Sequence, residues 1–441
     1  MKRLSSRLVS TLLFATLSSF QIANSQDLDT VTISGQVTDQ NGAVIPAAVV
    51  ELTFLKTGLK RNSTSNADGR YRLIQLEPGL YTVRITFAGF ASYELKEIAT
   101  LAGQSLQLDI RLTPAALKTE TVVVAAGDTL PVDTRRTVVG GTLSSREALL
   151  LPLPSRSVLD LIFTFPGIIE EPLSTRDLAE DRNVVNNNTP EEAGVFSLAG
   201  APAYSNNLTI DGLDNNDDRS ARERFQPPLE AVEEVQVITN QFSAEYGRAS
   251  GGRVNLRTRS GSTEFRGRGF YFFRDEALDA NTYRNNSLGL SRLPLQEHVG
   301  GFTFSGPIRA SSTFFIAYER TKVLDSALID TLLPVRQNSS FPLPLPTNLS
   351  RARLEDAKEP TLAAEVAPFI ASINTPSKTT NFTARLDQQF TDMHNLSVVY
   401  QSGRLNNLRQ FGGGNRLAEA LQAKKRNSDA ISISDNYVVS S

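Results

Sequence analysis

The segment Asn381-Phe-Thr-Ala-Arg-Leu-Asp387 alternates apolar and polar side chains with a period of two. Its three apolar residues point to one face of an extended strand, while Thr383, Arg385 and Asp387 point to the other. This alternation is typical of strands that cross a membrane in a barrel, with one face toward lipid and one toward the lumen. A soluble β-sandwich alternates in the same way, so the segment predicts a strand and leaves the architecture open.

Other stretches after residue 261 share this period. Strands are predicted at Phe265–Phe273, His298–Ser305, Thr313–Thr321, Thr380–Phe390, Leu396–Gln401 and Asp429–Tyr437. Their connections alternate between long (275–297, 323–378 and 403–428) and short (307–312 and 391–395). Outer-membrane barrels have short periplasmic turns and long outer loops. The first strand would therefore run outward, and the Pro342–Pro346 stretch would fall in an outer loop.

The length of this C-terminal part bears on whether a barrel can close. Beyond the N-terminal leader no stretch has the length and apolarity of a membrane helix, so only a closed β-barrel could place this chain in a membrane. Plugged barrels of about 22 strands, each of roughly 9–11 residues, need on the order of 220 residues for strands alone, more than follow Gly261. An eight-stranded barrel would fit the remaining length, but its interior would be filled by its own side chains and could not admit a domain of over a hundred residues. The chain also ends at Val438–Ser441 without a terminal aromatic residue. We therefore expect a fragment with an incomplete barrel.

The N-terminus has the composition of an export signal. Three basic residues within the first seven precede an apolar run from Leu8 to Phe20, and Ala23–Ser25 supplies the small residues of a cleavage site. The run is shorter than the roughly 20 residues that span a bilayer. We predict a signal peptide at residues 1–25 and an exported protein.

Composition excludes several functions. The net charge of −2 argues against a nucleic-acid partner. The chain has no Cys and only two His, His298 and His394, which argues against disulfide frameworks, thiolate nucleophiles and Cys/His zinc sites. We expect no catalytic residue, no cofactor and no metal site, and the protein is predicted not to be an enzyme.

Residues Val31–Thr113 predict a small antiparallel β-sandwich. Alternating runs at 32–37, 48–53, 71–74 and 81–85 are separated by turn residues at 39–42, 68–69 and 78–79. The module resembles the carboxypeptidase-regulatory-like, transthyretin-type domain, through Gly35-x-Val37-x-Asp39-x-x-Gly42, Asp68-Gly69-x-Tyr71, Pro78-Gly79-x-Tyr81 and Gly89-Phe90. This resemblance implies a fold described as carbohydrate-binding-like.

Such domains accompany zinc carboxypeptidases, so a secreted peptidase is one hypothesis. A zinc peptidase needs several ligands converging on one metal and a general base, which two His about a hundred residues apart do not provide. A structural or binding role is therefore favoured. Tyr71 and Tyr81 occupy alternating strand positions and are expected in the core rather than as sugar platforms.

Residues Thr137–Gly261 predict mixed helix and strand. Ser144-x-x-Glu147 is a capping box that opens a helix through Leu150, and Ser155 would cap a second helix that ends before Pro166-Gly167. In that second helix Val158, Leu161, Ile162 and Phe165 would share one face, and strands are predicted at Asn207–Asp211 and Val235–Thr239. The segment resembles the plug domain of TonB-dependent receptors, Oar-like branch, in four motifs: Leu151–Arg156, Phe165–Gly167, Asn206–Asp217 and Ser243–Gly261. Two positions depart from that pattern: Ser155 stands where Gly is expected, and Arg253 where an apolar residue is expected.

The acidic run Asp211–Asp218 invites a calcium hypothesis, because that ion prefers oxygen ligands. Registered from Asp214, however, the run places Arg219 where an EF-hand needs Gly and Phe225 where it needs Glu. A solvated, hydrogen-bonded turn is favoured. The plug resemblance places the run near the outward surface. Five of its residues are therefore weak candidates for ligand contact: Asp214, Asn215, Asn216, Asp217 and Asp218.

The stretch Thr119–Ala125 lies between the two modules. Its Val-rich sequence has strong β propensity and no sequential partner, so we predict an unpaired strand on a linker. Such a strand can dock on another protein's sheet edge through main-chain hydrogen bonds. It resembles a TonB box, and this resemblance implies docking by Glu120, Thr121, Val122, Val123 and Val124. The alternative is a strand that closes the neighbouring sandwich.

The sequence thus predicts a mainly β fold: a transthyretin-like β-sandwich, a mixed α+β plug and the first strands of an incomplete antiparallel transmembrane barrel. The expected divisions are a signal peptide (1–25), the sandwich (26–114), a linker with the TonB-box-like strand (115–136), the plug (137–261) and the barrel (262–441).

The resemblance implies a TonB-dependent receptor in the outer membrane of a Gram-negative-type bacterium. Such a receptor binds a scarce external ligand, a sugar, peptide or metal chelate, and imports it by energy-coupled rearrangement of the plug. Its partners would be a TonB-type periplasmic energy-coupling protein, outer-membrane lipid and that ligand. The alternative is an Oar-type adhesion or envelope structural protein without active transport.

Overall fold

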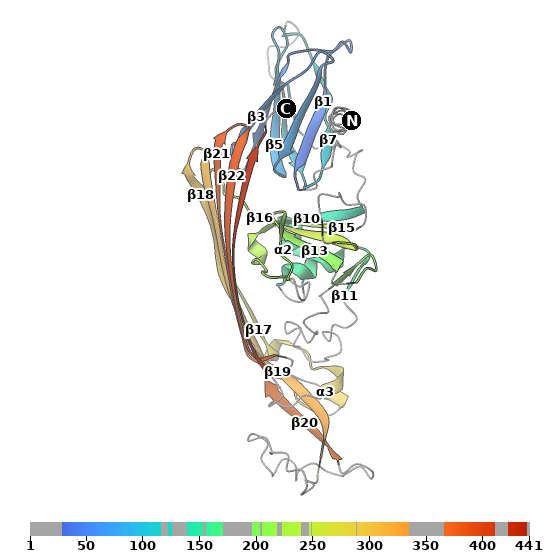
Figure 1. Ribbon diagram of the computed structural model, residues 1–441, viewed down its shortest axis with the longest axis vertical. Helices are drawn as coiled ribbons and strands as arrows, with labels where there is room; N and C mark the ends of the chain where they lie inside the picture. The colour runs from blue at the N-terminus through green and yellow to red at the C-terminus, as the bar shows by residue number, and fades with distance from the viewer. Residues whose placement is uncertain are drawn as a thin grey trace, which may run out of the picture.

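Three bodies follow one another in the computed structural model: a β-sandwich at one end, a plug in the middle, and a long curved sheet beside the plug (Figure 1). The structure describes residues 29–115, 122–125, 139–151, 153, 156–170, 196–202, 205–217, 223–239, 247, 249–287, 289–334, 366–410 and 422–438. The predicted signal peptide and the Pro342–Pro346 stretch lie outside these residues.

The sandwich has two sheets that enclose one core. One contains β4, β1 and β7, with β8 also paired to β1, and the other runs β3-β2-β5-β6-β9. The strands are β1 (Val31–Asp39), β2 (Val49–Phe54), β3 (Lys60–Thr64), β4 (Arg70–Leu76), β5 (Gly79–Thr86), β6 (Tyr93–Thr100), β7 (Ser105–Gln107), β8 (Ile110–Leu112) and β9 (Val122–Ala125). The four predicted strands are confirmed.

The four predicted strands pair antiparallel, β1 with β4 and β2 with β5, as expected. The sandwich also contains parallel pairs that were not predicted, because β1 pairs in parallel with both β7 and β8. The chain crosses back after β6 and so returns in the direction of β1. Tyr71 and Tyr81 lie in the core, as predicted, and their hydroxyls donate to the carbonyls of Leu108 and Glu77. At the β4 turn Gly69 has a φ of +71°, and a Cβ there would lie 2.7 Å from the Val37 carbonyl oxygen. This explains the Asp68-Gly69 pair.

The plug is a sheet of order β10-β15-β16-β13-β14 with short helices packed on it. Its elements are β10 (Val139–Ser144), α2 (Ser145–Leu150), η3 (Val158–Thr164), β11 (Ile168–Glu170), β12 (Phe196–Leu198), β13 (Asn206–Ile210), β14 (Leu213–Asp214), η5 (Leu229–Ala231), β15 (Val232–Thr239) and β16 (Gly252–Thr258). The predicted strands β13 and β15 are confirmed, and so is the capping box of Ser144 and Glu147.

The second predicted helix differs from expectation. It is the 3-10 helix η3, and its N-cap is Ser157, whose side chain makes no capping hydrogen bond. Val158, Leu161 and Ile162 are fully buried, as their spacing predicted. The sequence identified the buried face correctly, but the short interval before Pro166-Gly167 favours the tighter helix.

The third body is an antiparallel sheet of order β17-β18-β19-β21-β22-β23, with β20 paired to the far end of β19. Its elements are β17 (Arg266–Asp275), η6 (Glu276–Leu278), α3 (Tyr283–Ser287), β18 (Leu295–Arg309), β19 (Ser312–Pro334), β20 (Val366–Asn374), β21 (Ser377–Thr391), β22 (His394–Gln410) and β23 (Gln422–Tyr437). All six predicted strands are present, and most are longer than predicted. Strand β20 falls inside the predicted 323–378 connection.

Both short turns of this sheet, 310–311 and 392–393, lie beside the sandwich, since each lines a small groove with sandwich residues. The connections that carry α3 and β20 lie at the opposite end (Figure 1). Outer-membrane barrels place short turns on the periplasmic side. The sandwich therefore occupies the end of the sheet that corresponds to the periplasm.

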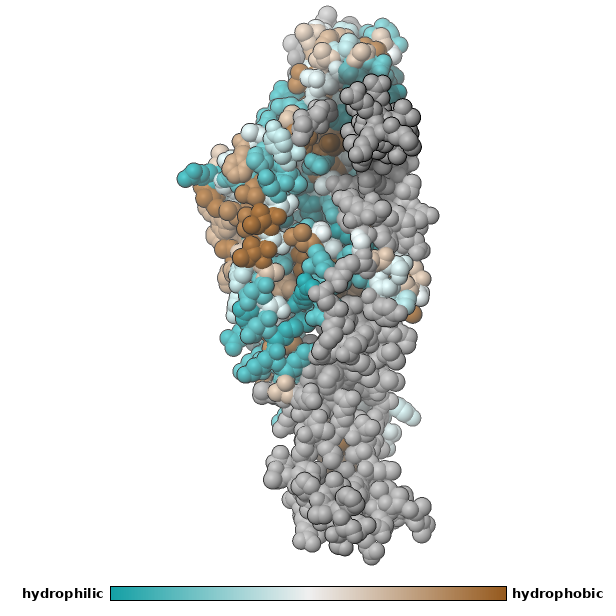
Figure 2. All heavy atoms as spheres, viewed as in Figure 1, coloured by the Kyte–Doolittle hydropathy of each residue, from teal (hydrophilic) through white to brown (hydrophobic). Residues whose placement is uncertain are grey.

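The two faces of the sheet differ as the alternation predicted. Thr383 and Arg385 are 0% and 6% exposed and face the plug, whereas Leu386 is 41% exposed on the opposite face. Figure 2 shows hydrophobic side chains gathered over the part of this sheet nearest the sandwich. Among the large hydrophobic side chains exposed there are Phe302, Phe304, Ile308 and Phe390. A polar inner wall and an apolar outer wall are what a lipid-embedded sheet requires.

Within the described residues, no helix combines the length and apolarity needed to cross a membrane.

Candidate gating interface and coupling strand

The Val-rich strand β9 is paired, not free. It runs parallel to β6, with Val122 opposite Tyr93 and Ala125 opposite Lys96. The prediction of an unpaired strand was therefore wrong. The physical reason is that β6 would otherwise be the edge of its sheet, with open hydrogen-bonding groups that a following β-forming segment can satisfy. Glu120 and Thr121 lie outside the described residues.

Strand β9 is itself the last strand of its sheet among the described pairings. An edge strand presents a row of backbone N–H and C=O groups to a further strand. The arrangement thus permits both strand addition to β9 and exchange of β9 from β6 to another sheet edge.

The acidic turn is held by its own side chains. Asn215 Nδ2 donates to the Phe225 carbonyl at 2.8 Å, and Asn216 Oδ1 accepts from the Leu208 amide at 3.0 Å. Both asparagine side chains are buried. Asp214 Oδ1 accepts from the Asn216 amide at 3.1 Å. These contacts fit the hydrogen-bonded turn that the sequence favoured.

The first residues of the acidic run lie toward the sandwich. Asp211 and Leu213 line a cavity beside the sandwich, at the short-turn end of the sheet. Among the described residues no three His, Asp or Glu side chains are grouped to hold a metal ion. Asp217 is described and Asp218 is not, and ligand contact by residues 214–218 stays a prediction.

A charged contact joins the plug to the inner wall of the sheet. Arg156 donates to Glu230 Oε2 at 2.6 Å and lies 3.9 Å from Glu319 Oε2 on β19. Its guanidinium also stacks over the Phe272 ring, 4.0 Å from the centroid. The plug and sheet meet here through charge and cation–π attraction.

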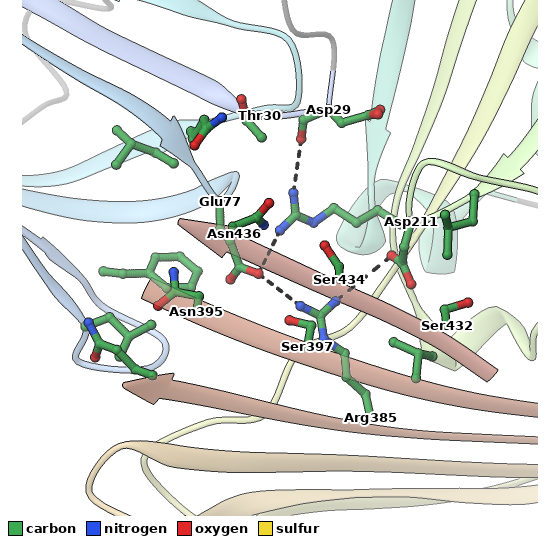
Figure 3. A pocket seen from close by; sticks show the side chains of 18 of the residues that line it. Asp29, Thr30, Glu77, Asp211, Arg385, Asn395, Ser397, Ser432, Ser434 and Asn436 are labelled. Carbon is green, nitrogen blue, oxygen red and sulfur yellow. Dashed lines mark hydrogen bonds and ion pairs between the residues drawn. The ribbon is translucent and has the colours of Figure 1, made fainter. Parts of the chain in front are cut away.

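A three-way ion-pair junction joins the sandwich, the plug and the sheet (Figure 3). Glu77, between β4 and β5, accepts from Arg385 of β21 at 2.9 Å, and the same oxygen lies 3.3 Å from Arg257 of β16. Arg385 also donates to Asp387 at 2.8 Å and to the Thr258 carbonyl oxygen at 3.2 Å. One carboxylate of the sandwich thus pairs with two guanidinium groups from two other bodies, of which that of Arg385 is buried.

A second ion pair ties the N-terminal edge of the sandwich to the plug. Arg253, fully buried, donates in bidentate fashion to Asp29 at 2.9 and 3.0 Å. Asn255 donates to the same carboxylate at 2.9 Å. This explains why a cation can stand where the plug pattern has an apolar residue.

Strand β15 completes the contact between plug and sandwich. Glu234 accepts from the Ala102 amide at 3.3 Å, Gln236 donates to the Ala102 carbonyl at 3.1 Å, and Lys56 pairs with Glu233 at 2.8 Å. Burial raises the pKa of Glu234 to about 7, against the opposing effect of Arg257. Burial also acts to raise the pKa of Glu233, but Lys56 and nearby arginines outweigh it and the pKa is lowered.

The Glu77 junction borders a cavity of about 300 Å³ between the three bodies, with both polar and apolar lining. Figure 3 shows Glu77, Asp211 and Arg385 around it, with Ser432 and Ser434 on β23. No sequence motif pointed to Glu77, Arg257 or Arg385 as a group. They lie 308 residues apart at the extreme, between Glu77 and Arg385, and no local spacing reports such a contact.

Sequence comparisons match each body in order. A family model for the carboxypeptidase regulatory-like domain matches residues 32–113, the TonB-dependent receptor plug domain matches 143–253, and an outer membrane beta barrel domain matches 257–341. The TonB-dependent transporter Oar of Myxococcus xanthus is 27% identical over 313 residues. The chain thus carries a TonB-dependent receptor plug domain followed by an outer membrane beta barrel domain.

The match to Oar covers 68% of this chain and 28% of the Oar protein, so the chain spans under a third of that relative. The receptor is located in the outer membrane, as its plug and barrel domains show. Members of the TonB-dependent receptor family are receptors rather than enzymes.

Two solved structures are similar to the receptor over part of its length. The transporter YddB from Escherichia coli has 13% identity and a TM-score of 0.41, covering 60% of this chain and 33% of its own. The siderophore receptor PirA from Acinetobacter baumannii has 16% identity and a TM-score of 0.40, covering 68% and 38%.

Proposed function

We propose that this receptor binds a scarce external ligand and imports it across the outer membrane by energy-coupled movement of the plug. The observation that carries the proposal is the position of β9. A short strand that follows the sandwich in the chain is the last strand of a sandwich sheet among the described pairings, on the side of the long sheet that bears the short turns. A TonB-type periplasmic protein could take hold of it there by strand addition.

The character of the plug–sheet contact supports a movable gate. Among the described residues, the plug meets the inner wall through charged contacts such as the Arg156–Glu319 ion pair and the hydrogen bond from Arg385 to the Thr258 carbonyl oxygen. A small apolar cluster of Ala231, Phe315 and Ala317 also spans the two. Charged contacts of this kind can be exchanged for water at lower cost than a shared apolar core. The plug can therefore shift without the sheet unfolding.

The experiment removes residues 119–125 from the receptor in its own cells. Labelled glycans, peptides and iron chelates are screened for accumulation that a protonophore abolishes. The deletion should abolish accumulation of the responsive probe and leave its binding at the cell surface intact. Val123→Thr, which keeps β propensity, serves as the control and should import normally.

Unchanged accumulation after the deletion would contradict energy-coupled import. Surface binding with no protonophore-sensitive accumulation in the unaltered receptor would favour the adhesion or envelope role. Selectivity among sugars, peptides and chelates is decided by the same screen.

A further inference from the structure

Among the residues that the structure describes, the sandwich and the plug do not share a hydrophobic core. One cluster of buried apolar residues lies wholly within residues 31–112, and the other lies wholly within residues 148–256. Between them the described contacts are ion pairs and hydrogen bonds. Interfaces of this composition within a chain are typical of parts that separate during function.

Glu77 occupies the centre of that polar interface. Its carboxylate is one-third exposed, whereas the two guanidinium groups paired with it are less exposed, with Arg385 buried at 6% and Arg257 at 14% exposure. The guanidinium groups of Arg257 and Arg385 repel each other, and the Glu77 carboxylate that pairs with both offsets this repulsion. Withdrawal of Glu77 therefore weakens the attachment of the plug to the sandwich and of the sandwich to the sheet at once.

The strand that a coupling protein would pull, β9, connects to Glu77 through two neighbouring strands of the sandwich. Strand β9 is hydrogen-bonded to β6, and β6 is bonded to β5, which begins at Gly79, two residues after Glu77. Tension applied to β9 therefore enters the sandwich sheet before it reaches the plug at β10. The first contacts to carry the load are those that attach the sandwich.

We propose that the sandwich is a latch on the plug: the junction of Glu77, Arg257 and Arg385 holds the gate closed, and tension on β9 must detach the sandwich before the plug moves. This rests on the proposed import function. It adds an order of events, with the sandwich released first and the plug second.

The order can be measured by force spectroscopy on the receptor in a lipid nanodisc. The cantilever carries the periplasmic domain of a TonB-type coupling protein, which serves as the probe. A lock is made from Asn62→Cys and Met393→Cys, which border one groove between β3 and the β21–β22 turn, joined by a short bismaleimide. The chain has no other cysteine.

The unaltered receptor should show two successive extensions, the first from sandwich release. Glu77→Gln should shift the first extension to lower force, and the locked receptor should show neither extension before the probe detaches. Glu51→Gln is the matched control, since Glu51 pairs with Lys60 inside the sandwich at 3.1 Å and should leave both extensions unchanged.

The outcomes separate the two proposals. Plug extension in the locked receptor at the unaltered force would overturn the latch and leave import standing. If the coupling-protein probe does not bind a receptor in which β9 is accessible, the proposed role of β9 in energy coupling is wrong. Should Glu77→Gln fail to fold, the locked receptor alone decides whether the sandwich must leave first.

Discussion

Arg253 shows how one residue can depend on a partner far away in the sequence. Its guanidinium is fully buried in β16, while Asp29 keeps 26% of its side chain exposed. Removing Asp29 leaves a buried cation without that carboxylate, whereas removing Arg253 leaves a carboxylate that water can reach.

Asp29→Ala should therefore destabilise β16 against local opening by about 2 kcal/mol, more than Arg253→Met does. The double variant should come close to the unaltered protein, because both charges are gone. Hydrogen exchange of the β16 amides measures all three. Equal costs for the two single variants would contradict this account of the pair.

Glu234 predicts a pH dependence of the sandwich–plug contact. Its folded pKa of about 7 lies above the ordinary 4.5, so the protonated form is favoured when folded. The contribution of Glu234 to the stability of the folded contact is therefore complete below pH 4.5 and is lost as the pH rises through 7. The loss amounts to at most roughly 3 kcal/mol. The lowered pKa of Glu233 acts in the opposite sense and only below its ordinary value.

Protection of the Ala102 amide, corrected for intrinsic exchange, should therefore fall between pH 5 and pH 8. Glu234→Gln should remove that slope, since an amide oxygen still accepts from Ala102 and no longer titrates. A slope that survives the substitution would place its origin in another group.

At the residue scale, the sequence predicted those side-chain directions that follow from the alternation of residues along a strand. The inward direction of Thr383 and Arg385 follows from alternation alone, and so does the buried position of Tyr71 and Tyr81. Arg253 stood out as a departure, but its partner lies 224 residues away. Which ions meet across bodies depends on docking, which no local pattern records.

At the scale of elements, the prediction that β9 is a strand was correct, and the prediction that it is unpaired was wrong. The strand was predicted from β propensity, but its partner was not, because the open edge of β6 exists only once the sandwich has folded. Similarly, six strands of the long sheet followed from period two. Strand β20 was missed because it extends the far end of β19 within a segment long enough to be a loop.

Val123→Pro tests the role of β9 pairing. Proline removes a backbone donor and disfavours an interior strand position, so β9 should leave β6. Hydrogen exchange should show faster exchange along the freed β6 edge, and titration should show loss of binding to the periplasmic domain of a TonB-type protein. Val123→Thr is expected to keep both properties.

At the scale of the whole molecule, the two walls of the sheet face different surroundings. Ile431 and Ile433 of β23 are 70% and 65% exposed on the outer wall, while Ser432 between them lines the cavity on the inner wall. Arginine on a lipid-facing strand costs about 2–4 kcal/mol near the bilayer midplane and less toward the interfaces.

Ile431→Arg and Ile433→Arg should therefore lower the amount of receptor recovered from the outer membrane, with the larger effect at the residue nearer the midplane. Ser432→Arg adds the same charge toward the lumen and should have the smaller effect. Recovery from isolated outer membranes in the presence of urea gives the comparison. An equal loss for all three would mean that the assigned outer wall does not meet lipid.

The separate cores also bear on how such chains diversify. A module joined to its neighbours by ion pairs and hydrogen bonds, with a core of its own, can be lost or gained by recombination without emptying the core of the plug. One buried group that depends on its presence is the Arg253 side chain, whose counter-charge arrives with Asp29. Descendants that discard the module should therefore replace this arginine with an aliphatic residue, and the two features should be inherited together across lineages.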